Sequence, residues 1–185
     1  MKQKRIVTED FFIGNLGTPE ASEEIVSRCP EELQYDEATV AYDPIPQHVH
    51  RKCLTAWLDV EKSNFIETGL KKIIINVNDM IWKFDLKKEW DTNIQFTKYS
   101  GGGDHYGWHQ DNFQGDCSDR RLSVVYCLSK KSDYTGGNFQ IRKSDNSVHT
   151  SKFDYGDFIV FPSDKYHRVL PLKSGNRLTM VGWFR

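Results

Sequence analysis

The chain has 185 residues, enough for one domain with a sizeable hydrophobic core. It carries 25 Lys and Arg against 26 Asp and Glu, a formal charge of -1, so its overall charge predicts neither nucleic acid nor an anionic membrane as partner. The sequence shows no apolar run of the length that a signal peptide or a membrane span needs, and its four cysteines form no CxxC pair, so we expect a cytoplasmic protein with free thiols.

The first 92 residues are expected to form a helical layer. Thr18-Pro19-Glu20 is typical of a helix start, because Thr can cap the first turn and Pro is favoured at the first helical position; this helix would run toward Cys29. Further along, apolar residues recur at steps of three and four between Phe65 and Phe84, which is the period of an amphipathic helix. A second, longer helix is therefore predicted over residues 65–84.

From residue 93 onward the pattern changes to short β-like runs separated by Gly, Asp and Asn. Candidate strands lie at 94–99, 105–111, 121–129, 138–143, 147–154, 157–161, 166–172 and 177–185. Eight such strands with polar turns predict an all-β barrel or a double-sheet jelly roll, and of the two we favour the jelly roll, a cupin-like double-stranded β-helix. The expected fold is α+β: one domain, residues 1–185, in which helices of a support layer (1–92) pack on one sheet of the core (93–185). The polar segments 112–120 and 130–137 are the expected lids over a site.

The second candidate strand ends in His109-Gln110-Asp111. Residues i and i+2 of a strand point to the same face, so both side chains can converge on one metal ion. The pair alone is too short a motif to be specific, and a third ligand decides the matter. His167 opens the seventh candidate strand, and a jelly roll brings distant strands together. Two His and one carboxylate form the facial triad of non-haem Fe(II) oxygenases. Asp104 and His105 are expected to be polar turn residues rather than ligands.

An iron site of this kind often uses a keto acid as electron source, and the far carboxylate of the keto acid needs a cation. Arg177 lies ten residues after His167, beyond a hairpin-sized connection that we expect to return the chain beside the seventh strand. A guanidinium can bind a carboxylate through two parallel hydrogen bonds. Arg177, Thr179, Val181 and Trp183 alternate along one strand, so they are expected to share its inward face.

Several motifs taken together resemble those of a known family: Tyr99, "HYGWHQD", "YTGGNFQI", "YGDFIVFPS", "HRV", and the run from Arg177 to Trp183. The set resembles the Fe(II)/2-oxoglutarate-dependent dioxygenases of the prolyl 4-hydroxylase type, in particular the small PKHD-type hydroxylases. The resemblance covers roughly residues 50–185.

The resemblance implies roles for individual residues. His109, Asp111 and His167 would bind Fe(II), and Arg177 would bind the distal carboxylate of 2-oxoglutarate. Tyr99, Thr179 and Trp183 would line the co-substrate pocket. Related enzymes often carry a tyrosine on the third strand that helps to hold this carboxylate; here the position is Cys127, with Tyr126 on the opposite face. Substrate contacts are expected from the rim, at Tyr106, Trp108, Asn112 and Arg121.

The activity implied by the resemblance is hydroxylation of an unactivated C–H bond with consumption of O2 and release of succinate and CO2. A peptidyl proline is the expected target, so the partner would be a proline-containing protein or peptide. Ascorbate joins the candidate cofactors, and the chain is expected to be a monomer or homodimer. A free amino acid or another small molecule is an alternative substrate, and a non-catalytic cupin-like metal-binding module is an alternative class. A nucleic-acid demethylase is disfavoured, because the position of its second arginine is Trp183 here.

Overall fold

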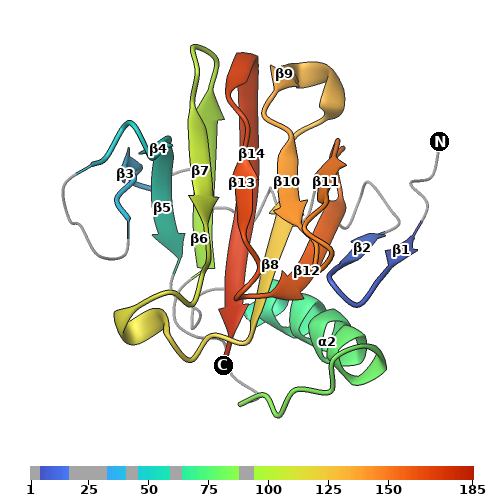
Figure 1. The fold of residues 1–185 in the computed structure, drawn as a ribbon. Helices are drawn as coiled ribbons and strands as arrows, with labels where there is room; N and C mark the ends of the chain where they lie inside the picture. Colours follow the sequence, from blue (N-terminus) through green and yellow to red (C-terminus); the bar gives the residue numbers. More distant parts are fainter. Residues whose placement is uncertain (1–4, 17–32, 41–45, 59–63, 88–93) are drawn as a thin grey trace.

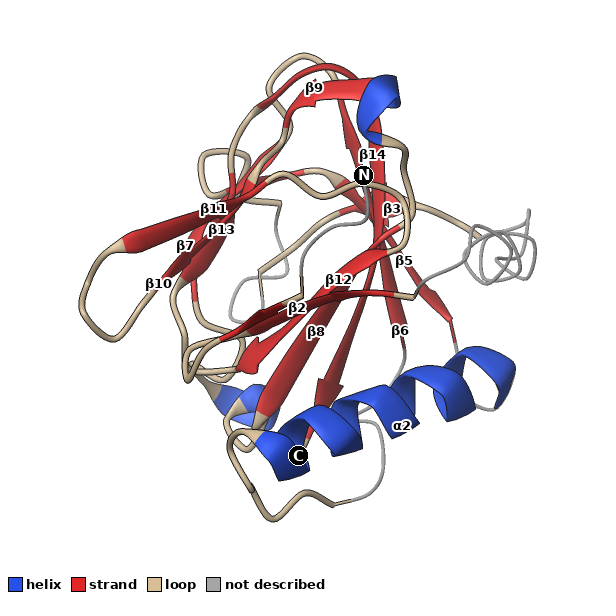
Figure 2. Ribbon diagram, turned by 90° about the vertical axis from the view of Figure 1, so that its right-hand side faces the viewer, coloured by secondary structure: helices blue, strands red, loops and turns tan. Residues whose placement is uncertain are grey.

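The computed structural model describes residues 5–16, 33–40, 46–58, 64–87 and 94–185. Within these residues two antiparallel sheets face each other, and one long helix lies outside the larger sheet (Figures 1 and 2). This is the layered core that eight short amphipathic strands predicted, because each sheet buries one face against the other. The helix predicted from Thr18 toward Cys29 lies outside the described residues.

The larger sheet has nine strands. Its order along the hydrogen-bonded path is β1 (Ile6–Val7), β2 (Phe12–Asn15), β12 (Asp157–Pro162), β8 (Leu122–Cys127), β14 (Leu172–Phe184), β6 (Ile94–Ser100), β5 (Leu54–Leu58) and β3 (Asp36–Glu37); β9 (Tyr134–Gly136) pairs with one end of β14.

The smaller sheet has five strands. Its order is β11 (Val148–Ser151), β10 (Phe139–Arg142), β13 (His167–Val169), β7 (His105–His109) and β4 (Arg51–Lys52). All eight predicted core strands are present, four in each sheet, with ends that differ by a few residues from the predicted ranges.

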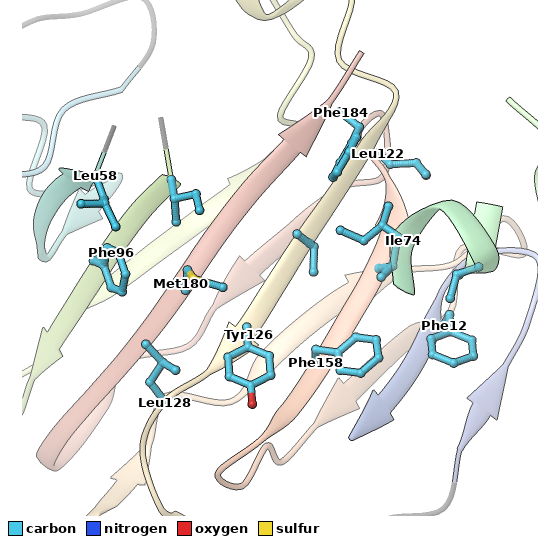
Figure 3. Packing of buried hydrophobic residues seen from close by; sticks show 14 of the residues in the cluster. Phe12, Leu58, Ile74, Phe96, Leu122, Tyr126, Leu128, Phe158, Met180 and Phe184 are labelled. Carbon is cyan, nitrogen blue, oxygen red and sulfur yellow. The ribbon is translucent and has the colours of Figure 1, made fainter. Parts of the chain in front are cut away.

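Helix α2 (Asn64–Met80) confirms the predicted amphipathic helix, although it ends four residues earlier than expected. Figure 3 shows Ile74 facing the side chains of the larger sheet, among them Phe12 and Phe158. Asn78, in the last turn of the helix, binds the segment that follows: its side-chain oxygen accepts a hydrogen bond from the Phe84 amide and its side-chain nitrogen donates to the Phe84 carbonyl. The chain therefore leaves the helical path before residue 84, while the apolar face of α2 stays packed on the larger sheet. No helix in the described part of the chain combines the length and apolar character needed to cross a bilayer.

The helical layer predicted for residues 1–92 is wrong in part. In the described portion of that region α2 is the one α-helix, and the remaining elements are the five short strands β1 to β5, which extend both sheets. These strands have only two to five residues, too few to show a period-two pattern in the sequence. Strand β9, within the segment predicted as a lid, was missed for the same reason.

The space between the sheets holds a second apolar cluster, separate from the one under α2. Because successive side chains of β8 point to opposite faces, its residues divide between the two apolar clusters. Tyr126 packs on the helix side, whereas Val125 and Cys127 face the smaller sheet. The functional residues lie at the open end of this inter-sheet space.

Candidate metal centre and adjoining cavity

Two histidines from neighbouring strands of the smaller sheet face each other directly. His109 is the last residue of β7 and His167 is the first of β13, and the two are paired in register. Asp111 follows two residues after His109, and its amide donates to the Ser163 carbonyl at 2.9 Å. The ligand atoms of the three side chains lie within 4.8 Å of one another, and both His Nε2 atoms are 3.6 Å from Asp111 carboxylate oxygens. This arrangement matches a two-histidine, one-carboxylate metal centre.

Backbone carbonyls orient both imidazoles. His109 Nδ1 lies 2.8 Å from the Gly107 carbonyl, and His167 Nδ1 lies 2.9 Å from the Lys165 carbonyl. A carbonyl only accepts, so each Nδ1 carries a hydrogen and Nε2 is the atom that each ring can offer to a metal. Burial, followed by the effect of His167, lowers the pKa of His109 well below its ordinary value. His109 is therefore neutral at physiological pH, the form that binds a metal.

Ser123, on β8 of the other sheet, orients the carboxylate. Its hydroxyl lies 2.7 Å from Asp111 Oδ2 and 2.9 Å from the Ser163 hydroxyl. Burial acts to raise the pKa of Asp111, but His167, His109 and the Ser123 hydroxyl outweigh it, so this pKa lies below the ordinary value. The ligand set thus combines an ionised carboxylate with a neutral imidazole at His109.

A bulge in β7 places Tyr106 on the metal side. Between the pairs Tyr106–Val169 and His109–His167, β7 contains one residue more than β13. Residues three apart in a regular strand point to opposite faces, but the extra residue brings both side chains to the same face. The Tyr106 ring stacks on His109, with centroids 3.5 Å apart and planes 14° apart. Tyr106, predicted as a substrate contact at the rim, thus lies directly against a metal ligand and lines both the outer pocket and the inner cavity.

Arg51, which the sequence reasoning missed, lies behind Tyr106. Its guanidinium carbon is 4.4 Å from the Tyr106 ring centroid, and its side chain is 7% exposed. It donates to the Thr39 carbonyl and to Gln95 Oε1, both at 2.9 Å. These hydrogen bonds fix the guanidinium beside the Tyr106 ring, where it makes a cation–π contact. The signal available in the sequence was weak: a charged residue before the short apolar run Leu54–Leu58.

Arg177 is the largest fully buried side chain in the described part of the chain, with 1% of its surface exposed. Its Nε and Nη2 atoms have no hydrogen-bond partner there, and its guanidinium lies 5.5 Å from the ring centroid of Tyr99, its cross-strand neighbour. A buried cation with unsatisfied donors is costly unless an anion completes it. A carboxylate binds to two such donors, so the side chain fits the role of keto-acid anchor.

The expected hairpin between the strands of His167 and Arg177 does not form. β13 and β14 lie in opposite sheets, and β14 pairs with β6 and β8 instead. The predicted sharing of one face is nevertheless confirmed: Arg177, Thr179, Val181 and Trp183 all line one cavity of about 460 Å³. Arg177 therefore approaches the metal ligands from the opposite sheet rather than from a neighbouring strand.

This cavity brings together most of the predicted site. It is lined by residues of both sheets, including the three metal ligands together with Tyr99, Tyr106, Arg177, Thr179 and Trp183. Cys127 does not line it, and its thiol lies 3.4 Å from the Ser129 carbonyl. Cys127 nevertheless lies on the inward face of β8, where burial raises the pKa of its thiol and the nearby Arg177 guanidinium opposes that effect. Tyr99 and Thr179 are polar neighbours of Arg177 that line the cavity.

The predicted rim is partly corrected. Trp108 lines an outer pocket at the mouth, together with His109 and Asp111. Asn112 and Arg121 line neither this pocket nor the cavity. Arg121 instead donates its amide to the Phe184 carbonyl, whereas the preceding residue Arg120 lines the cavity with its guanidinium 4.0 Å from the Trp183 ring centroid. A shift of one position along an extended chain reverses the side-chain direction, which explains the error.

Of the two predicted lids, the segment 112–120 contributes to the mouth and the segment 130–137 does not. Phe113, Gln114 and Cys117 line the outer pocket. Residues 130–137 form a short 3-10 turn and β9, and none of them lines either pocket. Asp104 follows the turn at 101–103, whereas His105 is the first residue of β7 rather than a turn residue, and the metal cluster found among the described residues includes neither. The Asp104 carboxylate accepts from the Ser100 amide at 2.8 Å, and His105 contacts the Gly103 carbonyl.

Comparisons with known proteins agree with this geometry. The profile of the 2OG-Fe(II) oxygenase superfamily matches residues 94–185. A PKHD-type hydroxylase of Prochlorococcus marinus (strain MIT 9515) is 41% identical over 113 residues, which cover 61% of this chain and 49% of the relative. A second one, from strain MIT 9215, is 37% identical over 131 residues, covering 68% and 57%. The chain spans about half the length of the curated relatives that it matches.

Solved structures share the fold. A Trichoplax adhaerens prolyl hydroxylase, in complex with a peptide fragment of the hypoxia inducible factor oxygen degradation domain, superposes with a TM-score of 0.78 at 21% identity. The match covers 96% of this chain and 84% of that one. A Pseudomonas putida prolyl-4-hydroxylase gives a TM-score of 0.71 at 22% identity, covering 96% and 93%.

The chain belongs to the 2OG-Fe(II) oxygenase superfamily, whose fold is the double-stranded β-helix. The curated relatives that it matches are PKHD-type hydroxylases, and two prolyl hydroxylases share its fold. The cofactors of this superfamily are Fe(II), 2-oxoglutarate and O2. The triad of His109, Asp111 and His167 fits the metal, and the unsatisfied Arg177 fits the keto acid.

Proposed function

We propose that this chain is an Fe(II)- and 2-oxoglutarate-dependent dioxygenase that hydroxylates a peptidyl proline, with release of succinate and CO2. The observation that carries the proposal is the unsatisfied guanidinium of Arg177 in the cavity that also contains the three metal ligands. A cupin-like module with a structural metal has no need of a buried cation there. The geometry therefore favours an enzyme with an anionic co-substrate.

Some residues of the cavity would bind the iron and the keto acid, and others would limit the entry of water. His109, Asp111 and His167 would hold iron on one side, leaving the remaining coordination positions to the keto acid and O2. Arg177 would bind the distal carboxylate of the keto acid, with Tyr99 and Thr179 beside it. Trp183 and Tyr106 close the cavity with aromatic surface and limit the entry of water. The bound iron and keto acid supply the power to activate O2 for attack on a C–H bond.

A peptide substrate is supported by two features. The outer pocket continues from His109 and Asp111 to Trp108, Phe113 and Tyr166, so a chain lying across the surface could present one side chain to the metal. The similar Trichoplax protein was solved with a peptide fragment. A free amino acid would not need the aromatic surface outside the mouth, and this difference favours the peptide.

An anaerobic titration with Fe(II), followed by 2-oxoglutarate, tests the proposal. Chelation of the keto acid is expected to give a weak visible charge-transfer band that Arg177→Ala and His109→Ala each weaken strongly. Lys173→Ala is the matched control, because Lys173 is an exposed residue of the same strand. Under air, succinate should form together with hydroxyproline in a proline-containing peptide. Iron binding without a band would contradict the keto-acid site, and succinate without hydroxyproline would contradict the substrate.

A further inference from the structure

Four residues form a basic aromatic patch beside the metal centre: Trp108, Arg142, Tyr166 and Arg168. The strands β7, β13 and β10 lie side by side in the smaller sheet (Figure 1). Trp108 immediately precedes the ligand His109, and Tyr166 and Arg168 flank the ligand His167. The ligands face the other sheet, so these neighbours face the outer surface.

Contacts between the four side chains define the patch. The guanidinium carbons of Arg168 and Arg142 lie 4.6 Å and 5.1 Å from the Trp108 ring centroid. Arg142 also lies 5.5 Å from the Tyr166 centroid. A guanidinium stacked on a ring keeps its edge donors free while its side chain is held in place. The patch is therefore an ordered pair of cations on an aromatic base.

Neither arginine is neutralised within the described chain. Arg168 donates Nε to the neutral amide oxygen of Gln140 at 2.7 Å, and no ion pair between described residues involves Arg168 or Arg142. The nearby lysines differ, because Lys165 is paired with Asp10 at 2.6 Å and Lys143 with Asp145 at 3.3 Å. The chain as a whole carries a formal charge of -1, so this local excess of positive charge is a property of the patch.

The patch continues into the entrance of the metal centre. Trp108 and Tyr166 line the outer pocket together with His109, Asp111 and Phe113. Phe113 and Tyr166 are exposed, at 59% and 41%. A polypeptide that places one residue at the metal would thus lie with its flanking residues over this surface.

We propose that the basic aromatic patch binds acidic residues that flank the hydroxylated position of a peptide substrate. This proposal rests on the proposed function and adds a charge requirement to it: Glu or Asp in the flanking segment would pair with Arg142 and Arg168. Nucleic acid fits less well, because two unpaired cations are few for a phosphate backbone. Stacked arginines with fixed edge donors suit individual carboxylates.

Fluorescence anisotropy with two labelled peptides tests the charge requirement. The peptides share a central proline and differ only in flanking residues, Glu in one and Gln in the other. The protein is loaded with Fe(II) and 2-oxoglutarate without oxygen, so that no turnover occurs. We expect the Glu peptide to bind more tightly, and Arg142→Gln and Arg168→Gln each to weaken it by about two- to fivefold, the range of an exposed ion pair. Added salt should reduce the difference between the peptides.

Controls separate this proposal from the function on which it rests. Lys152→Gln removes an exposed positive charge outside the patch and should leave binding of the Glu peptide unchanged. Equal binding of both peptides, or no effect of either arginine variant, would overturn the patch proposal. Tighter binding of a single-stranded oligonucleotide than of the Glu peptide would overturn it as well. The keto-acid band is recorded in the same samples: a normal band restricts any failure to the patch, whereas its absence overturns the proposed function also.

Discussion

At the metal centre, the hydroxyl of Ser123 donates a hydrogen bond of 2.7 Å to Asp111 Oδ2 and so connects the two sheets. Each metal ligand has a partner of this kind, since both histidines are held by backbone carbonyls. Ser123 differs from these backbone partners because a substitution can remove its hydroxyl without changing the main chain. It is completely buried and lies on β8, opposite the strands that supply the ligands.

Replacing Ser123 with Ala should weaken binding of Fe(II) by about 10- to 100-fold, because loss of an outer hydrogen bond frees a ligating carboxylate. Competition with a colorimetric chelator under anaerobic conditions measures the affinity. Ser132→Ala is the control, since Ser132 is exposed and outside the site. Unchanged affinity in S123A would show that the backbone and the two histidines suffice to orient Asp111.

Within β14, the segment that precedes Arg177 lies close to a neighbouring stretch of backbone. Gly175 has φ +78°, and a Cβ added there would overlap the Asp133 carbonyl oxygen, because β9 and its preceding turn lie directly against β14. Gly102, in the loop between β6 and β7, also has a positive φ, +101°, but a Cβ there would meet nothing within 4 Å. Substitutions at the two glycines therefore distinguish the cost of backbone strain from the cost of a steric collision.

Gly175→Ala should destabilise the protein more than Gly102→Ala. Both variants carry the strain of a left-handed alanine, about 1–3 kcal/mol. Only the change at Gly175 adds a collision, which costs about 1–3 kcal/mol more in a packed environment. Urea unfolding of the metal-free variants measures both free energies. Equal losses would mean that β9 moves away from β14 without cost.

For the whole molecule, the charge state of two partly buried histidines links stability to pH. Burial, followed by His167, lowers the pKa of His109, and burial, followed by Lys143, lowers that of His149. In the unfolded chain both return to about 6.5. Below that pH the unfolded chain binds protons that the folded chain does not, so stability falls as the pH falls. The lowered pKa of Asp111 acts only at lower pH, below the ordinary value of 3.8.

We therefore expect the free energy of unfolding of the metal-free protein to decrease between about pH 7.5 and about pH 5.5, the range in which an unfolded histidine takes up its proton. Urea titrations across this range, with a chelator present, measure the change. His149→Gln should make the decrease smaller, since it removes one of the two groups. A stability that rises on acidification would contradict the assignment of neutral histidines in the fold.

Local patterns were sufficient to predict the core strands, the long helix and the pair His109 and Asp111, whereas His167 needed the expected jelly roll and the family resemblance. Alternation in strands and steps of three and four in helices depend on neighbouring residues, and His109 and Asp111 share a face because they are two apart. The inward row from Arg177 to Trp183 followed from the same alternation. A strand of two to five residues is too short to show a repeated alternation of apolar and polar residues, which is why β1 to β5 were taken for part of a helical layer.

The remaining features depend on contacts between segments far apart in the chain. The β7 bulge that turns Tyr106 onto His109 exists only in pairing with β13, and Arg51 reaches Tyr106 because β4 pairs with β7. Strand pairing likewise places Arg177 in the opposite sheet, and it makes Arg120, rather than the predicted Arg121, line the cavity. Alternation specifies which residues share a face, whereas the direction of that face and its neighbours are set when the sheets bury their apolar sides against each other.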